Sequence, residues 1–322
     1  MTTFDKLKLK SRYEYISDIR EDAFVEESIK SKRGDRELLY RKYEQKSPYS
    51  LLIMVNDRYN ELIIEFTGKI LLDDYPSLIN KDNIEDCLRE INRLGICKLN
   101  VEAILVDSEV LKCDVTKDVP LDNIGIIIEP IQQNLRNYKK WGCEPDQRNN
   151  GLVIRKLVKS KIRKRRLAIY DKAKEMRKAE YDGFWAAVSN KESMVSYFEG
   201  KVRFETNLTS TKAITELLNL PDKDYRLSSV LSSEANPILS VFDEAINSDT
   251  VTSKEVSTLK DYLHLLLLQS CNYDMVKVQA TLRQYMKNPT RAKGKADELK
   301  KLNNQIKPTD ATLLQSVRSL LL

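Results

Sequence analysis

Two short segments carry the residue types needed to cleave a phosphodiester bond. The first, RRLAIYDKAKEM, places Tyr170 at the end of an apolar run and Lys172 just after it. The second, KVRFETNL, places Arg203 and Glu205 on one side of an expected strand, because successive side chains alternate between its two faces. If the two strands are neighbours, a phenol, a carboxylate and cations converge.

These groups suit the attack of a tyrosine oxygen on a DNA phosphodiester. Tyr170 would attack in line, while Lys172 and Arg203 offset the charge on phosphorus. Carboxylates such as Glu205 supply the oxygen ligands of Mg²⁺ or Mn²⁺, which would polarise the phosphate. The products would be a 5′-phosphotyrosine and a free 3′-OH that a polymerase can extend. The phosphotyrosine keeps enough bond energy for the strand to be rejoined later.

Other reactive groups are scarce. The one histidine, His264, lies in the apolar segment YLHLLLLQ, where a structural role is expected. Histidine-dependent hydrolases, tyrosine recombinases and His-hydrophobe-His relaxases therefore lose support. Neither GxxxxGK[ST] nor GxGxxG occurs, which argues against a nucleotide-driven helicase or kinase. The five cysteines form no CxxC pair, which argues against a disulfide framework and a zinc site.

The two segments together resemble a paired motif of phage and plasmid replication initiators. In the filamentous-phage type and the Rep_trans plasmid type, an IY-[DN]-K strand precedes an R-[FV]-E strand, as in LAIYDKAKEMRK and GKVRFETNL. The upstream segments FTGKILLDDYPSLINKDNIEDCLREINRLGI and KCDVTKDV also look like the corresponding part, so the resemblance covers roughly residues 60–210. It implies a rolling-circle initiator that nicks one DNA strand at an origin and later rejoins strands.

The resemblance also assigns roles residue by residue. Tyr170 matches the nicking tyrosine, and Glu205 matches the strand acid near the metal. Asp114, in CDVT, matches an acidic strand position that completes the metal site. Some plasmid members have a second acid two residues after the one matching Glu205, where this chain has Asn207. Two acids are alternatives to Asp114: Asp118 and Glu102.

Positive charge is concentrated directly before Tyr170. Residues 151–180 hold twelve Lys or Arg and three acidic residues, whereas the whole chain of 322 residues carries a net charge of +6. Such a stripe can bind a phosphate backbone, because each neutralised phosphate releases counterions. An ordinary solvated face is the alternative. The expected DNA-binding residues, called the basic stripe below, are Arg155, Lys156, Lys159, Lys161, Arg163, Lys164, Arg165 and Arg166.

Three aromatic residues have candidate roles beside the stripe. Tyr181 and Trp185 follow Tyr170 in the chain and could stack on unpaired bases, although core packing is the expected role of Trp185. Tyr138 and Tyr181 are the candidates for a second nucleophile, which strand rejoining would need.

The surrounding pattern predicts an α+β fold with an antiparallel sheet. The start of the chain (LKLKSRYEYI) is expected to be extended, and SLLIMV with ELIIEF a hairpin. A helix is expected from the cap Asp82 to Gly95. Further predictions are strands at 99–106 and 110–115, IGIIIEPI in or beside the sheet, helix or loop at 28–45, and an exposed loop at 138–151.

Helical patterns dominate after residue 211. The predicted organisation is a nicking domain at 1–211 and an α-helical region at 212–322. For the helical region we expect duplex recognition or oligomerisation, as a homodimer, with a host helicase as a further partner. The apolar runs are far shorter than the roughly 20 residues that span a bilayer, and the first residues lack a secretory pattern, so a cytoplasmic location is expected.

Three classes of function stay open at this point. A metal-dependent nicking and joining enzyme would form a covalent DNA adduct that Tyr170→Phe abolishes. A non-catalytic origin- or operator-binding protein would keep full DNA binding in that variant and form no adduct. An interaction protein whose basic face meets RNA or acidic protein surfaces would show no preference for an origin sequence. The tyrosine and the acid on paired strands favour the first class.

Overall fold

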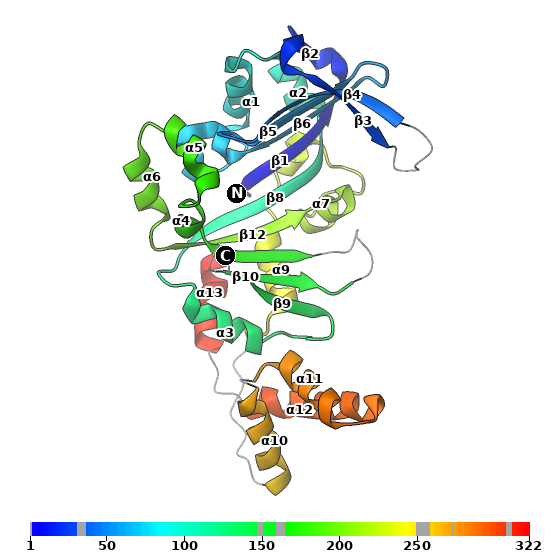
Figure 1. Cartoon of the computed structure of the whole chain (residues 1–322), viewed down its shortest axis with the longest axis vertical. Helices are drawn as coiled ribbons and strands as arrows, with labels where there is room; N and C mark the ends of the chain where they lie inside the picture. The colour runs from blue at the N-terminus through cyan, green and yellow to red at the C-terminus, as the bar shows by residue number, and fades with distance from the viewer. Residues whose placement is uncertain are drawn as a thin grey trace.

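A single antiparallel sheet organises the chain (Figure 1). The computed structural model describes residues 2–30, 37–146, 151–158, 165–248, 258–271, 273–306 and 311–322. Within these ranges ten strands form the sheet, in the spatial order β3 (Val25–Lys30), β4 (Glu37–Gln45), β5 (Leu51–Asn56), β6 (Glu61–Thr67), β1 (Phe4–Ser11), β8 (Glu109–Pro120), β12 (Lys201–Leu208), β11 (Arg166–Asp171), β10 (Gly151–Lys156) and β9 (Trp141–Asp146). A two-stranded sheet joins β2 (Ile16–Ser17) to β7 (Lys98–Leu99).

One face of the sheet is buried under helices. Alternate residues of β12, such as Val202 and Phe204, belong to the main apolar core, as do Leu7 and Leu9 of β1. The helices that contribute to this core are α1 (Ile84–Arg93), α2 (Val101–Asp107), α3 (Gly125–Gln133), α7 (Thr211–Leu217), α8 (Leu227–Leu231), α9 (Pro237–Ala245) and α13 (Ala311–Leu321).

The opposite face is covered only in part. An aromatic cluster built from Tyr75, Tyr181, Phe184 and Phe198 lies over Arg203 of β12. Its residues come from η3 (Gly68–Ser77), η5 (Ala179–Tyr181), α5 (Asp182–Ala187) and α6 (Lys191–Phe198), and α4 (Lys172–Glu175) packs against it through Ala173. Figure 1 shows α4, α5 and α6 gathered beside β1, β8 and β12. The remaining part of this face carries mainly polar side chains, and we call it the polar face; its residues include Glu65, Asp114, Arg155, Arg166, Glu205 and Asn207.

Three helices form a separate cluster at the β9 end of the molecule (Figure 1). They are α10 (Leu259–Ser270), α11 (Met275–Tyr285) and α12 (Pro289–Ile306). Tyr138 packs into their core, and Lys139 forms an ion pair with Asp297 of α12. In the part of the chain that the structure describes, no helix is both long and apolar enough to cross a membrane.

Several predicted elements are confirmed. The expected hairpin is β5 paired with β6, and the expected helix is α1, which ends before Gly95 in the left-handed region at φ +67°. Asn83, rather than Asp82, precedes its first residue. The two reactive segments form β11 and β12, paired as antiparallel neighbours. The α+β prediction and the predominance of helix after residue 211 are also confirmed.

Other predicted elements are wrong. Residues 99–106 were expected to form a strand, but Asn100 accepts a hydrogen bond from the Ala103 amide and starts helix α2. The expected helix or loop at 28–45 contains β3 and β4, and the expected loop at 138–151 contains β9. Of the two options for IGIIIEPI, the second is confirmed: the segment forms helix α3, which packs on the sheet's apolar core. The boundary at 211/212 does not divide the core, because α7, α8, α9 and α13 share the sheet's apolar cluster.

Candidate active site

A polar cavity of about 630 Å³ lies on the polar face. Strands β1, β8, β11 and β12 form its floor, and α4 and η5 form one wall. Part of another wall comes from the β4–β5 connection and from η3. The lining residues that concern the chemistry are Asp5, Lys69, Asp114, Arg166, Tyr170, Lys172, Tyr181 and Glu205.

Tyr170 and Glu205 meet in this cavity. They are diagonal neighbours across β11 and β12, where Tyr170 lies opposite Arg203 and Ala168 lies opposite Glu205. The Tyr170 hydroxyl donates a hydrogen bond to Glu205 Oε2 at 3.0 Å, and the tyrosine is 6% exposed. Burial, and then the charge of Glu205, raise the pKa of Tyr170 well above its ordinary value. The phenol therefore needs a proton acceptor, and Glu205 is in contact with it.

Asp114 and Glu205 are linked through Asn207. Asn207 lies opposite Asp114 in the pairing of β12 with β8. Its Nδ2 donates to Asp114 Oδ1 at 2.7 Å and to Glu205 Oε1 at 2.9 Å, while Arg166 donates to its Oδ1. Burial, and then the nearby charge of Glu205, raise the pKa of Asp114 to about 7. Burial, and then Asp5, raise the pKa of Glu205.

These groups suit a hard divalent cation. Asp114, Glu205 and the Asn207 side chain offer carboxylate and amide oxygens, the ligands that Mg²⁺ and Mn²⁺ prefer. Rotating the amide of Asn207 would direct its oxygen, instead of its nitrogen, toward both carboxylates. A cation would also offset the negative charges of Glu205 and Asp5, which raise the pKa of Asp114. The described ranges contain no group of three or more His, Cys, Asp or Glu residues that could hold a metal, so the candidate set is two acids and one amide.

Arg203 is not on the cavity wall. It is 0% exposed, and its guanidinium forms two hydrogen bonds to Asp118, at 2.7 and 2.8 Å. Its Nη1 also donates to Asp5 Oδ1 at 2.9 Å and to the Tyr75 hydroxyl at 3.0 Å. The catalytic role predicted for Arg203 from strand alternation therefore becomes a positioning role. Asp118, one of the two alternatives to Asp114 as a metal ligand, accepts hydrogen bonds from Arg203 at both carboxylate oxygens.

Lys172 lines the cavity but is 2% exposed. Its ammonium donates to the Tyr181 hydroxyl at 2.9 Å and to Glu175. Burial alone would lower the pKa of Lys172, but Tyr75, Tyr181 and Glu175 outweigh burial and raise it, so the ammonium stays charged. The Lys69 ammonium lies 3.7 Å from the centroid of the Tyr181 ring. Two lysines therefore lie beside Tyr181 in the cavity, and one of them, Lys172, has its ammonium 6.0 Å from the centroid of the Tyr170 ring.

The basic stripe is split between the two faces of the sheet. Arg155 and Arg166 lie opposite each other on β10 and β11, and alternation places Arg166 on the same face as Tyr170. Lys156 and Arg165 point to the helix-covered face, where they pair with Glu244 of α9 and Glu216 of α7. Arg155 in turn lies 3.2 Å from Glu144. Four members lie outside the described residues: Lys159, Lys161, Arg163 and Lys164.

The structure also sorts the remaining candidates. Tyr181 lines the cavity, whereas Tyr138 packs in the α10–α12 cluster. Asp5 and Lys69 line the cavity but were missed, because a lone acid in LKLK-like surroundings and a lysine after a strand carry no distinctive pattern. Gly151 was missed as well. A Cβ there would lie 2.4 Å from the Ile169 carbonyl oxygen and 2.8 Å from Tyr170 Cβ.

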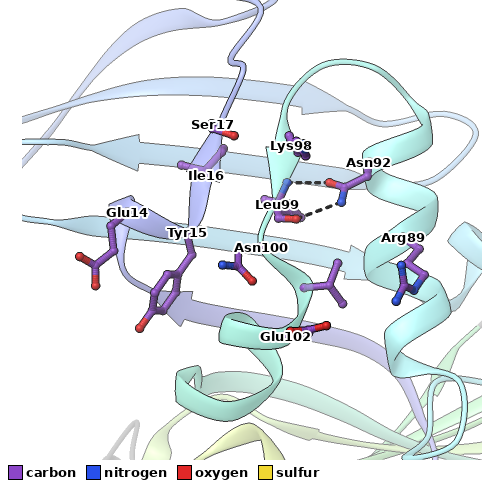
Figure 2. Close-up of a pocket in the computed structure, with 11 residues that line it drawn as sticks. Glu14, Tyr15, Ile16, Ser17, Arg89, Asn92, Lys98, Leu99, Asn100 and Glu102 are labelled. Carbon is purple, nitrogen blue, oxygen red and sulfur yellow. Dashed lines mark hydrogen bonds between the residues drawn. The ribbon is translucent and has the colours of Figure 1, made fainter.

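A second polar hollow, of about 510 Å³, lies beside β2 and β7 (Figure 2). Its polar groups serve local structure. The Asn92 amide bonds both backbone groups of Leu99, as the dashed lines in Figure 2 mark, and Asn100 caps α2. Arg89 is paired with Glu85. Glu102, the other alternative to Asp114, lines this hollow and so lies apart from Tyr170.

Comparison with protein-family models, with curated proteins and with solved structures finds no match to this chain.

Proposed function

We propose that the protein is a metal-dependent endonuclease that nicks and rejoins one DNA strand through Tyr170, as a rolling-circle replication initiator does. The observation that carries the proposal is the hydrogen bond from the Tyr170 hydroxyl to Glu205 inside a cavity that also holds Asp114 and Lys172. A nucleophile in contact with a base, surrounded by groups that stabilise charge, is the arrangement that nucleophilic catalysis requires.

The proton and bond changes follow from that contact. Tyr170 Oη attacks phosphorus and passes its proton to Glu205 Oε2, the carboxylate oxygen to which its hydroxyl already donates. The new bond joins the tyrosine to the 5′ phosphate, and the bond from phosphorus to the 3′ oxygen breaks. The departing 3′ oxygen takes a proton from water. Lys172 stays charged and offsets the negative charge on the phosphate.

Mg²⁺ or Mn²⁺, held by Asp114, Glu205 and the Asn207 oxygen, would polarise the non-bridging phosphate oxygens. Without a metal, Arg166 donates a hydrogen bond to the Asn207 amide oxygen; rotation of the amide toward a metal would exchange this bond for a metal ligand. Arg203 holds Asp118 and Asp5, and so holds β8 and β1 in place against β12. The nucleophile and the candidate ligands therefore lie on one rigid group of strands.

DNA would approach along the polar face. Arg166 and Arg155 continue from the cavity toward the β9 edge, and both can contact phosphates there. The partner would be an origin, as duplex and as single strand, and the released 3′-OH would serve a host polymerase. We further propose that α10–α12 recognise duplex DNA or mediate homodimer formation, with a host helicase as a further partner.

The test is formation of a covalent adduct. Protein, Mg²⁺ or Mn²⁺ and single-stranded oligonucleotides or supercoiled DNA of the parent element are mixed and resolved on a denaturing gel. We expect an adduct with the unmodified protein and none with Tyr170→Phe. Trypsin should leave the bound nucleotides on the peptide LAIYDK, which contains Tyr170.

Tyr138→Phe is the matched control, because Tyr138 is also buried but lies outside the cavity. It should form the adduct at the normal rate. Tight binding of origin DNA with no adduct or nick under any metal would replace the enzyme with the non-catalytic DNA-binding alternative.

A further inference from the structure

A smaller cavity, of about 240 Å³, lies on the other side of α4 from the candidate active site. Lys172 and Glu175 of α4 line the active-site cavity. Ala173 of α4, and Met176 directly after this helix, line the smaller cavity. The same division continues after α4: Tyr181 lines the first cavity, and the two residues Asp182 and Trp185 of α5 line the second. The two cavities are thus separated by about the width of one helix, ~10 Å.

Trp185 is held in a fixed orientation at this cavity. Its indole N–H donates to the Met176 carbonyl oxygen at 2.7 Å, so its one polar group is already satisfied. The ring is half-buried, and the Lys191 ammonium lies 5.2 Å from its centroid. What the ring offers to the cavity is an apolar aromatic surface beside a cation, which is the chemistry that stacks on a nucleobase.

The rest of the cavity fits the same ligand. Met176, Val195 and Phe198 make its interior apolar. Its other lining residues include two cations, Arg177 and Lys191. Arg177 is highly exposed, and its contact with the acidic partner Glu199 is long, at 4.0 Å. Its guanidinium can therefore also contact a phosphate. A volume of about 240 Å³ corresponds to roughly eight waters at ~30 Å³ each, which is room for one nucleobase.

We infer that this cavity binds one nucleobase of single-stranded DNA, stacked on Trp185, close to the nucleotide whose phosphate enters the active site. The choice of single-stranded DNA as the ligand rests on the proposed nicking function. A base inside a duplex is already stacked and paired, so the site would take an unpaired or flipped base. Arg177 and Lys191 would contact the adjoining backbone phosphates.

The experiment uses the full chain with Tyr170→Phe, so that binding is measured without covalent chemistry. The chain has two tryptophans, Trp141 and Trp185, and Trp141 is 2% exposed in the core. Titration with single-stranded oligodeoxynucleotides of the parent element should quench tryptophan fluorescence, and Trp185→Phe should remove the quenching. Trp185→Leu should weaken binding about five- to hundredfold, with Trp185→Phe partly restoring affinity.

An abasic scan of the oligonucleotide locates the base. At one position an abasic sugar should weaken binding to the Trp185 protein, yet cause little further loss in Trp185→Leu. Quenching that persists in Trp185→Phe, or a flat abasic scan, would overturn the inference. An adduct on Tyr170 together with a flat scan leaves the nicking proposal intact and removes only this site. Quenching that depends on Trp185, without an adduct from the unmodified protein, would keep the base site and remove the nicking proposal.

Discussion

Asp114 and Glu205 are two acids close together in a largely buried position, and their arrangement costs stability. The raised pKa of Asp114 means that the folded state holds a proton that the unfolded state releases at its ordinary pKa of 3.8. As pH rises from about 4 to about 7, the folded state therefore loses stability relative to the unfolded state. Above about 7 the full cost is present. Strongly shifted pKa values of this kind are typical of binding sites and active sites.

We therefore expect Asp114→Asn to stabilise the protein while removing activity. The amide keeps the shape but not the charge, so the metal-free variant should gain about 1–3 kcal/mol at pH 8, since each pKa unit corresponds to about 1.4 kcal/mol. The gain should shrink as pH falls from 7 to 4. Urea unfolding at several pH values measures it. Mg²⁺ or Mn²⁺ should stabilise the unmodified protein, and less so as pH falls below about 7, but should not stabilise the variant; equal metal responses would contradict the assignment.

Arg203 exerts its effect through stability. Replacing it with Leu would leave Asp118 and Asp5 buried without their cation, and breaking a buried ion pair in this way costs about 3–5 kcal/mol. We expect Arg203→Leu to lower the free energy of unfolding by that amount. Adding Asp118→Asn should recover part of the loss, because it removes one of the unpaired charges. A fully stable Arg203→Leu that loses only nicking would instead return Arg203 to the catalytic role.

At the scale of elements, the strands that carry the candidate nucleophile and base could be predicted because their pattern is local. LAIY is a short apolar run, and KVRFETNL alternates between apolar and polar positions, which is the signature of a half-buried strand. Their adjacency could not be read from the sequence; the structure supplies it by pairing β11 with β12. The Tyr170–Glu205 contact is a direct consequence of that register.

Other parts of the site depend on contacts that no local pattern records. Asp5 reaches the cavity only because β1 enters the sheet between β6 and β8, far from β12 in sequence. Asn207 looked like a missing ligand, whereas its position opposite Asp114 makes it the link between two acids. The helix α2 was mistaken for a strand because VEAILVD is rich in β-branched and apolar residues. The side-chain cap from Asn100 decides the outcome.

At Gly151, strand β10 approaches Ile169 and Tyr170 of β11 closely, so we expect this glycine to fix the position of Tyr170. A side chain at Gly151 would collide with backbone atoms of β11, which cannot move away independently. Gly151→Ala should therefore shift Tyr170 and reduce the rate of adduct formation at least about tenfold, because small misplacements of reacting groups are costly. Gly142→Ala on β9 is the control, since its Cβ would meet only the flexible Leu157 side chain, at 3.1 Å. Equal rates for the two variants would refute the positioning role.

At the scale of the whole molecule, the sheet divides the positive charge of the basic stripe between the polar face and the helix-covered face. Composition alone treats the basic stripe as one surface. In the structure Lys156 and Arg165 anchor helices α9 and α7 to the sheet, while Arg155 and Arg166 lie on the polar face with the cavity. A single segment of sequence therefore contributes cations to both faces, because alternate side chains of a strand point in opposite directions.

This division gives a test with internal controls. In the Tyr170→Phe background, Arg155→Gln and Arg166→Gln should each weaken single-strand binding. Each should also reduce the slope of log K against log salt concentration by about 0.7, the value for one phosphate contact on a single strand. Lys156→Gln and Arg165→Gln should leave that slope unchanged and lower only the free energy of unfolding. All four come from one segment of like charge, so equal slopes across the set would show that net charge, and not the polar face, governs DNA binding.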